Sequence, residues 1–203
     1  TYWSDYACPY CYIGETRLGK AIASLGLEGE VEVEMRAFEL NPDAPYEVAG
    51  PTLDRFAAKY GLSKEEAAER IEGISRMGRG EGIEFNYATT LNTNMLDAHR
   101  LTKLAHSLGN TSFESLCYEA CFVKNEVMAD RGVLRKLAAE AGLPEADVER
   151  VLASDEYEDE VAEPAPRSRR TSPFASTTQE TADYTAPATT ASAPSGGFSG
   201  QVL

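Results

Sequence analysis

The chain has 203 residues, of which 42% are hydrophobic, and this is enough for one sizeable globular domain with an inserted subdomain. Its 33 acidic residues outnumber its 19 basic ones, so the formal net charge is −14. Such a charge repels phosphate backbones and anionic lipid surfaces, and we expect neither nucleic-acid nor membrane partners. No stretch approaches the ~18 consecutive apolar residues that a membrane span needs.

The four cysteines occupy positions 8, 11, 117 and 121, and they are too few and too unevenly spaced for a disulfide-stapled scaffold. A redox or metal-binding role is favoured, and a reducing, cytoplasmic location fits a dithiol that is kept for its chemistry. The chain begins at Thr1 within an apparent strand and without an initiating methionine. We therefore expect further residues upstream, and any leader sequence would lie among them.

Residues 1–48 predict a β-α-β unit. Residues 1–5 are typical of the end of a buried strand, and Pro9 suits the first turn of a helix that Gly26 would end. The helix carries apolar residues at Ile13, Leu18, Ile22 and Leu25. A second, half-buried strand is indicated by the alternation of Val31, Val33 and Met35 with Glu30, Glu32, Glu34 and Arg36, the glutamates forming its solvated face. A helix between two such strands implies parallel pairing.

Residues 49–161 predict a helical subdomain inserted after this unit. Helix starts are indicated at Pro51-Thr52, at Ser63 with Glu66, and at Thr111 with Glu114. Apolar stripes at helical spacing are formed by Ala67, Ile71 and Ile74 and by Leu101, Leu104 and Leu108. The helices are separated by Gly61, Gly109 and Gly142.

Residues 162–203 form an atypical tail rich in Ala, Ser, Thr, Pro and Gly, and its few bulky apolar residues cannot offset the entropy of ordering it. We expect the tail to be largely disordered. Two strands do not complete a sheet, and the missing strands should follow the helices, so the C-terminal part of the sheet is predicted to be incomplete. One hypothesis is a shifted reading frame after Pro164, which an intact frame on resequencing would remove.

The motif Cys8-Pro9-Tyr10-Cys11 lies at the predicted start of the first helix. Disulfide exchange needs a thiolate that attacks and a second thiol near enough to release the mixed disulfide. At the strand-to-helix turn, unpaired N–H groups and the helix dipole would stabilise the Cys8 thiolate, the dipole by at most ~2 kcal/mol. Pro9 and Tyr10 would tune this balance and contact the substrate. The β-α-β setting favours a redox site over half of a zinc site or a chance pair.

The stretch from Trp3 to Gly14, which contains this motif, resembles the DsbA-family dithiol-disulfide isomerases of the FrnE-like branch. The resemblance continues in Phe38-Glu39-Leu40-Asn41-Pro42, Lys59-Tyr60-Gly61-Leu62, Gly82-Ile83-Glu84-Phe85-Asn86, Asp97-Ala98-His99-Arg100-Leu101 and Leu152-Ala153-Ser154-Asp155, and so spans residues 1 to about 161. It implies an α/β, thioredoxin-like fold with a large inserted all-helical subdomain. It also implies that Cys8 is the nucleophile and Cys11 the resolving thiol, with no metal and no cofactor beyond the cysteine pair, although glutathione is a candidate thiol substrate.

Members of this family close with a loop whose cis-proline faces the cysteines and holds the substrate. Here the similar stretch is Thr171-Ser172-Pro173-Phe174, which is one residue short and has no strand pattern after it. The resemblance makes Pro173 a candidate substrate-binding residue. An ordinary proline within the tail is the simpler interpretation, since most X-Pro bonds are trans.

Cys117 and Cys121 are four residues apart on a predicted helix, where Cβ atoms lie roughly 5–6 Å from one another, wider than a disulfide prefers. We interpret them as small buried hydrophobic residues, while a second redox pair, or a zinc site shared with the first two cysteines, stays open. His99 and His106 share one helix face, and His99 is expected to be packed and hydrogen-bonded rather than catalytic.

The leading functional hypothesis is a DsbA-like thiol-disulfide oxidoreductase or isomerase that acts on protein or small-molecule thiols and disulfides through Cys8 and Cys11. One alternative is a glutathione-dependent enzyme of the 2-hydroxychromene-2-carboxylate isomerase or kappa-class transferase type. Those enzymes carry serine at the nucleophile position, so Cys8 argues against them. The other alternative is a non-catalytic or inactive protein with an altered terminus.

Overall fold

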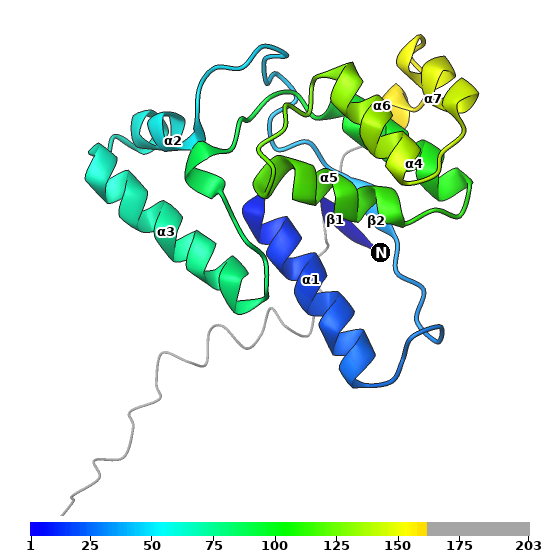
Figure 1. The fold of residues 1–203 in the computed structure, drawn as a ribbon, viewed down its shortest axis with the longest axis horizontal. Helices are drawn as coiled ribbons and strands as arrows, with labels where there is room; N and C mark the ends of the chain where they lie inside the picture. The colour runs from blue at the N-terminus through cyan, green and yellow to red at the C-terminus, as the bar shows by residue number, and fades with distance from the viewer. Residues whose placement is uncertain (162–203) are drawn as a thin grey trace, which may run out of the picture. The chain divides into compact units, whose positions relative to one another are not determined.

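The computed structural model describes residues 1–161, and the tail that follows, with Pro173, lies outside the described residues. The chain opens with strand β1 (Tyr2–Ser4), helix α1 (Pro9–Ser24) and strand β2 (Met35–Ala37), as Figure 1 shows. The two strands pair in parallel, with Trp3 opposite Arg36. The predicted β-α-β unit is therefore confirmed.

The predicted position of the second strand is wrong. Val31 and Val33 are 43% and 37% exposed and precede the strand, which begins at Met35. The start and end of β2 are set by its pairing with β1, because β1 has three residues that pair and these lie opposite Met35–Ala37. Met35 and Ala37 are buried while Arg36 is exposed, the alternation expected of a strand with one solvated face. The predicted acidic positions Glu30, Glu32 and Glu34 are exposed, but they lie before the strand.

Three helical elements follow the second strand, namely α2 (Thr52–Tyr60), α3 (Lys64–Gly80) and the short 3-10 helix η1 (Tyr87–Thr89). Helix α2 ends at Gly61, whose φ of +62° lies in the left-handed region that favours glycine. Helix α3 begins with the predicted capping box, in which Ser63 and Glu66 each accept the backbone N–H of the other. The predicted stripe of Ala67, Ile71 and Ile74 is buried. These elements pack against one another, and α3 also packs against α1 (Figure 1).

Five further helices complete the described chain: α4 (Leu96–Ser107), α5 (Ser112–Phe122), α6 (Arg131–Glu140), α7 (Glu145–Leu152) and α8 (Glu158–Val161). Helix α4 contacts each of the other four (Figure 1). Its predicted apolar stripe is confirmed at Leu101 and Leu104, which are buried. Leu108 is 48% exposed, because α4 ends at Ser107 before the stripe could continue.

The start of α5 was predicted correctly, but its cap was not. Thr111 makes no side-chain hydrogen bond to the helix. The side-chain oxygen of Asn110 accepts the backbone N–H groups of Ser112 and Phe113 instead, at 3.0 and 3.3 Å. Asparagine is as effective as a hydroxyl residue at satisfying the free N–H groups of a helix start, so the position one residue earlier takes the role.

One hydrophobic cluster joins the β-α-β unit to the later helices. It includes Tyr6, Ile13, Met35, Leu101, Phe113, Tyr118, Leu134 and Val151. The buried Arg100 side chain adds polar links from α4, donating to the carbonyls of Val151 and Glu156 and pairing with Asp97 at 2.8 Å. The boundaries predicted for an inserted subdomain at 49 and 161 stay a prediction.

Candidate functional site

Cys8 and Cys11 lie at the N-terminus of α1, where the sequence places them. Cys8 is the N-cap residue and Pro9 occupies the first helical position. The Cys11 backbone N–H donates to the Cys8 carbonyl at 3.1 Å, so the two cysteines are one turn apart. Both are partly exposed, and neither forms a disulfide in this structure. Tyr10, between them, is 56% exposed and can meet a substrate.

The two thiols ionise as a pair. A hydrogen bond from the Cys8 side chain, helped by one from Ser4, lowers the pKa of the Cys11 thiol to about 6. Hydrogen bonding to Cys11 and burial raise the pKa of the Cys8 thiol, although the backbone N–H groups of Cys11 and Tyr10 favour its thiolate. The pair therefore carries one negative charge at neutral pH and keeps one proton. A dithiol with one thiolate is the form that starts disulfide exchange.

Asp5 fixes the turn that leads into the motif. Its buried carboxylate accepts the backbone N–H groups of Ala7 at 3.0 Å and Leu40 at 2.7 Å. Its backbone carbonyl accepts the N–H of Cys8 at 3.0 Å. His99 of α4 completes the set, with Nε2 at 3.3 Å from the carboxylate. Asp5 thus connects three parts of the chain next to the thiols: the end of β1, the loop after β2, and helix α4.

The prediction that His99 is packed and hydrogen-bonded is confirmed. The side chain is fully buried, and its ring stacks on Tyr6 with centroids 4.8 Å apart. Its Nδ1 atom has no hydrogen-bond partner among the described residues. His106 is also hydrogen-bonded, through Nε2 to the Glu114 carboxylate. Of the two histidines, His99 reaches the Cys8 turn through Asp5.

Helix α5 contributes hydroxyl and aromatic groups beside Cys11. The Ser4 hydroxyl, which stabilises the Cys11 thiolate, lies 2.5 Å from the Tyr118 hydroxyl. The Tyr118 ring stacks on Tyr12 with centroids 5.0 Å apart and an interplanar angle of 5°. Through this stack, an aromatic ring of α5 packs against the first turns of α1.

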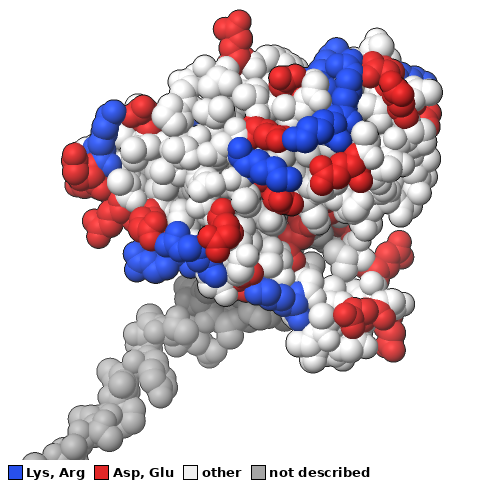
Figure 2. Space-filling view, in the orientation of Figure 1, with Lys and Arg blue, Asp and Glu red and all other residues white. Residues whose placement is uncertain are grey.

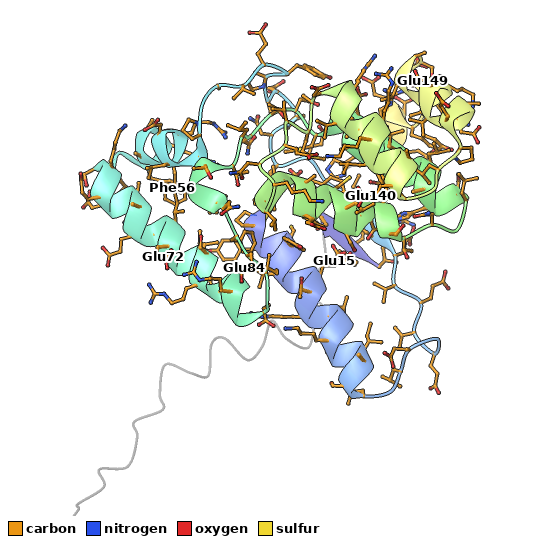
Figure 3. The ribbon with its side chains drawn as sticks, viewed as in Figure 1. Glu15, Phe56, Glu72, Glu84, Glu140 and Glu149 are labelled. Carbon is orange, nitrogen blue, oxygen red and sulfur yellow. The ribbon has the colours of Figure 1, made fainter. Side chains whose placement is uncertain are left out.

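Glu15 is a carboxyl group one turn beyond Cys11. Burial, followed by the charge of Glu114, raises the pKa of Glu15 to about 7, and the Cys11 thiolate acts in the same direction. The Oε2 atom is buried and has no partner among the described residues. Figure 3 shows Glu15 on the side of α1 that faces β1 and α5. A carboxyl that gains or loses its proton near neutrality therefore lies within the electrostatic range of the dithiol.

A cavity of about 640 Å³ opens beside Cys8. Its walls come from the Cys8 turn, the loop after β2, helix α2 and the segment from η1 to the start of α4. Tyr10, Arg55 and Lys59 are among the lining residues. The cavity brings helix α2, about 50 residues away in sequence, to the predicted nucleophile.

The interpretation of Cys117 and Cys121 as buried hydrophobic residues is confirmed. Both thiols lie in the core on α5, at 0% and 1% exposed, and neither is in a disulfide. Burial raises the pKa of both, that of Cys121 to about 12, so both are neutral at physiological pH. Within the described part of the chain, no group of three or more His, Cys, Asp or Glu side chains is arranged to hold a metal ion. Nor does any helix among residues 1–161 have the length and apolarity to cross a bilayer.

Sequence analysis did not identify three contributors to the site. The Asp5–His99 contact joins residues 94 positions apart, and no local pattern indicates it. Glu15 follows Cys11 by four residues, a helical spacing that does place it on the same face. Arg55 and Lys59 have the same spacing on α2, but only the tertiary structure brings that face to the thiols. Pro173, the predicted cis-proline candidate, lies outside the described residues.

Comparisons with known proteins agree with this geometry. The family model of the DsbA-like thioredoxin domain matches residues 1–169. The crystal structure of a probable DsbA oxidoreductase from Streptomyces coelicolor is similar to this chain at a TM-score of 0.74 and 35% identity, over 79% of this chain and 70% of that one. An uncharacterized protein of Bacillus subtilis, YwbO, is 28% identical over 166 residues, or 77% of this chain and 72% of that protein.

Proposed function

The chain belongs to the DsbA-like thioredoxin domain family of thiol-disulfide oxidoreductases, and from that premise we propose that Cys8 and Cys11 are its catalytic dithiol. The observation that carries the proposal is the position of the two free thiols, Cys8 as the N-cap of α1 and Cys11 one helical turn away, and hydrogen bonding that lowers the pKa of Cys11 to about 6 supports it. The thiolate of the pair attacks a substrate disulfide, and the second thiol releases the mixed disulfide.

The assignment of roles within the pair follows from access. Cys8 lines the cavity and Cys11 does not, so the sulfur of Cys8 is the one that meets a substrate. The proton that Cys8 shares with Cys11 must move to Cys11 before the attack, because the thiolate is the nucleophile. The N–H groups of Tyr10 and Cys11 stabilise the charge on Cys8 once the proton has moved. Pro9 and Tyr10 flank the path of the substrate, and a reducing cytoplasmic compartment would maintain this reduced form.

The test is catalysis of insulin reduction by dithiothreitol, measured with the full chain beside Cys8→Ser, Cys11→Ala and Cys121→Ala. The unaltered chain and Cys121→Ala are expected to accelerate the reaction, since Cys121 is buried and neutral. Cys8→Ser is expected to fall to the uncatalysed rate. Equal rates for Cys8→Ser and the unaltered chain would refute the dithiol function and favour the inactive, altered-terminus alternative.

The glutathione-dependent alternative makes a different prediction for Cys11. An isomerase or transferase of that type uses an external thiol, so it would keep its activity in Cys11→Ala and lose it without glutathione. A dithiol enzyme needs Cys11 to release the mixed disulfide, and Cys11→Ala is expected to accumulate a covalent adduct at Cys8 that mass spectrometry detects. Glutathione-dependent turnover by Cys11→Ala would contradict the proposed function.

A further inference from the structure

The walls of the cavity beside Cys8 have a composition that indicates a ligand. At about 640 Å³ the cavity is in the range of small-molecule sites, and it is lined by Cys8 itself. Helix α2 forms one wall with Arg55, Phe56, Lys59 and Tyr60. Any molecule that enters the cavity therefore meets the predicted nucleophile and this face of α2 together.

Arg55 and Lys59 are unusual among the basic residues of this acidic protein. Most arginines and lysines in residues 1–161 lie within 4.0 Å of a carboxylate, and on the face in Figure 2 basic and acidic side chains lie next to one another. Within the described residues, neither Arg55 nor Lys59 has such a partner. The nearby acid of α2, Asp54, pairs with Lys64 at 2.7 Å instead. Two cations in the cavity wall are thus free to bind an anion.

The acidic residues of the same cavity, Asp5 and Glu39, lie on walls other than helix α2. The Asp5 carboxylate already accepts two backbone N–H groups and contacts His99. Glu39, in the loop after β2, is partly buried, and burial raises its pKa. Among the lining residues, α2 contributes two positive charges and no negative one, in contrast to the excess of acidic residues in the chain as a whole.

Aromatic rings accompany the two cations. Phe56 and Tyr60 pack with centroids 4.6 Å apart, and Lys59 Nζ lies 5.6 Å from the centre of the Tyr60 ring. Figure 3 shows Phe56 on the side of α2 that faces η1. Tyr60 and Tyr10 are 53% and 56% exposed, so apolar surface is available to the ligand beside the positive charge.

We propose that this cavity binds a low-molecular-weight disulfide that carries carboxylates, with Arg55 and Lys59 holding the carboxylates while a sulfur contacts Cys8. This inference rests on the dithiol function proposed above and names its substrate class. The Cys8 thiolate attacks one sulfur of the disulfide, forms a Cys8–substrate disulfide and expels the other half as a thiolate, which takes up a proton. Cys11 gives its proton to that leaving half, attacks Cys8 as a thiolate and expels the second half, which takes up a proton from water, so that the protein dithiol loses two electrons and two small thiols are formed.

The test compares two small disulfides of opposite electrostatic character, dithiodipropionic acid, which is a dianion at neutral pH, and the uncharged hydroxyethyl disulfide. The second-order rate constant for oxidation of the reduced full chain is measured with each. In the double variant Arg55→Gln with Lys59→Gln, the ratio of the anionic to the neutral rate constant is expected to fall roughly threefold to tenfold. Added salt is expected to reduce the ratio for the unaltered chain and to have little effect on the variant.

The double variant Arg70→Gln with Arg76→Gln is the matched control, because both arginines are exposed residues of α3 without a described carboxylate partner and neither lines the cavity. It changes the net charge without changing the cavity, and its ratio is expected to equal that of the unaltered chain. An unchanged ratio in the Arg55 and Lys59 double variant, or an equal fall in the Arg70 and Arg76 double variant, would overturn the cavity assignment and leave the dithiol function standing. Failure of the unaltered chain to react with either disulfide would refute both.

Discussion

At the scale of single residues, Glu15 is a carboxyl group near the dithiol whose pKa folding raises to near neutrality. Its pKa is raised from 4.5 to about 7, first by burial. The folded chain therefore holds a proton that the unfolded chain has lost between these two values, and stability falls as the pH rises through this range. The effect is about 3 kcal/mol, complete above the folded pKa.

Glu15→Gln removes this titration. Its unfolding free energy in urea is expected to depend less on pH between 5 and 8 and to exceed that of the unaltered chain at pH 8 by about 1–2 kcal/mol. Glu84→Gln, which removes an exposed carboxyl, is the control and is expected to retain the original pH dependence. A Glu15→Gln variant with the same slope as the unaltered chain would show that Glu15 is ionised in the folded state throughout this range.

Some residues of the candidate site could be predicted from the sequence, and others could not. Cys8 and Cys11 were identified from a motif whose two members are neighbours on one helix turn, so local chemistry sufficed. Asp5 was visible within the same stretch, but its role depends on Leu40 and His99, which only folding brings near. Periodicity reports which face of an element is buried and carries no information about which distant residue that face meets.

At the scale of secondary structure elements, the contact between α3 and the segment after it depends on a glycine. A Cβ atom at Gly78 would overlap the ring of Phe85. That ring is 7% exposed and packs edge-on against Phe122 at 5.3 Å and Tyr12 at 5.7 Å, so it cannot move without disturbing α1 and α5. Gly78→Ala is expected to lower the unfolding free energy by about 1–3 kcal/mol.

Gly73, on the same helix, provides the control, because a Cβ atom there would meet nothing within 4 Å. Gly73→Ala is expected to raise the unfolding free energy by up to about 1 kcal/mol, since alanine favours the helix. Urea denaturation of both variants measures the two effects. Equal changes of the same sign would mean that helix propensity, rather than the Phe85 contact, governs Gly78.

The ends of helices were predictable from the sequence where neighbouring residues determine them. The capping box at Ser63 and the glycine after Tyr60 set the ends of α2 and α3 from within the sequence. The second strand was misplaced because its boundary is set by hydrogen bonding to β1 rather than by the alternation of Val31 and Val33. The predicted apolar stripe on α4 wrongly included Leu108, since no residue before it indicates that the helix ends at Ser107.

At the scale of the whole described chain, the Asp5–His99 contact links the dithiol turn to the later helices. His99 lies on α4, whose neighbours α5 to α7 share the core with Tyr6 and Ile13. The histidine therefore couples the stability of the helical segment to the position of Cys8, through a carboxylate that has two backbone donors besides it. A buried carboxylate that loses one of its donors keeps the cost of its desolvation.

His99→Leu is expected to lower the unfolding free energy by about 1–3 kcal/mol, because Asp5 would stay buried with one partner fewer. His99→Gln keeps a donor in a similar volume and is expected to recover part of that loss. Loss of the anchor should also change the thiols, so the pH midpoint of their alkylation by iodoacetamide is expected to move away from about 6 in His99→Leu and to return toward it in His99→Gln. The variant His106→Gln alters the other histidine, which does not contact Asp5, and is expected to move the midpoint less than His99→Leu does. An alkylation midpoint that is the same in all three variants would mean that His99 only packs, and that the helical segment does not influence the dithiol through Asp5.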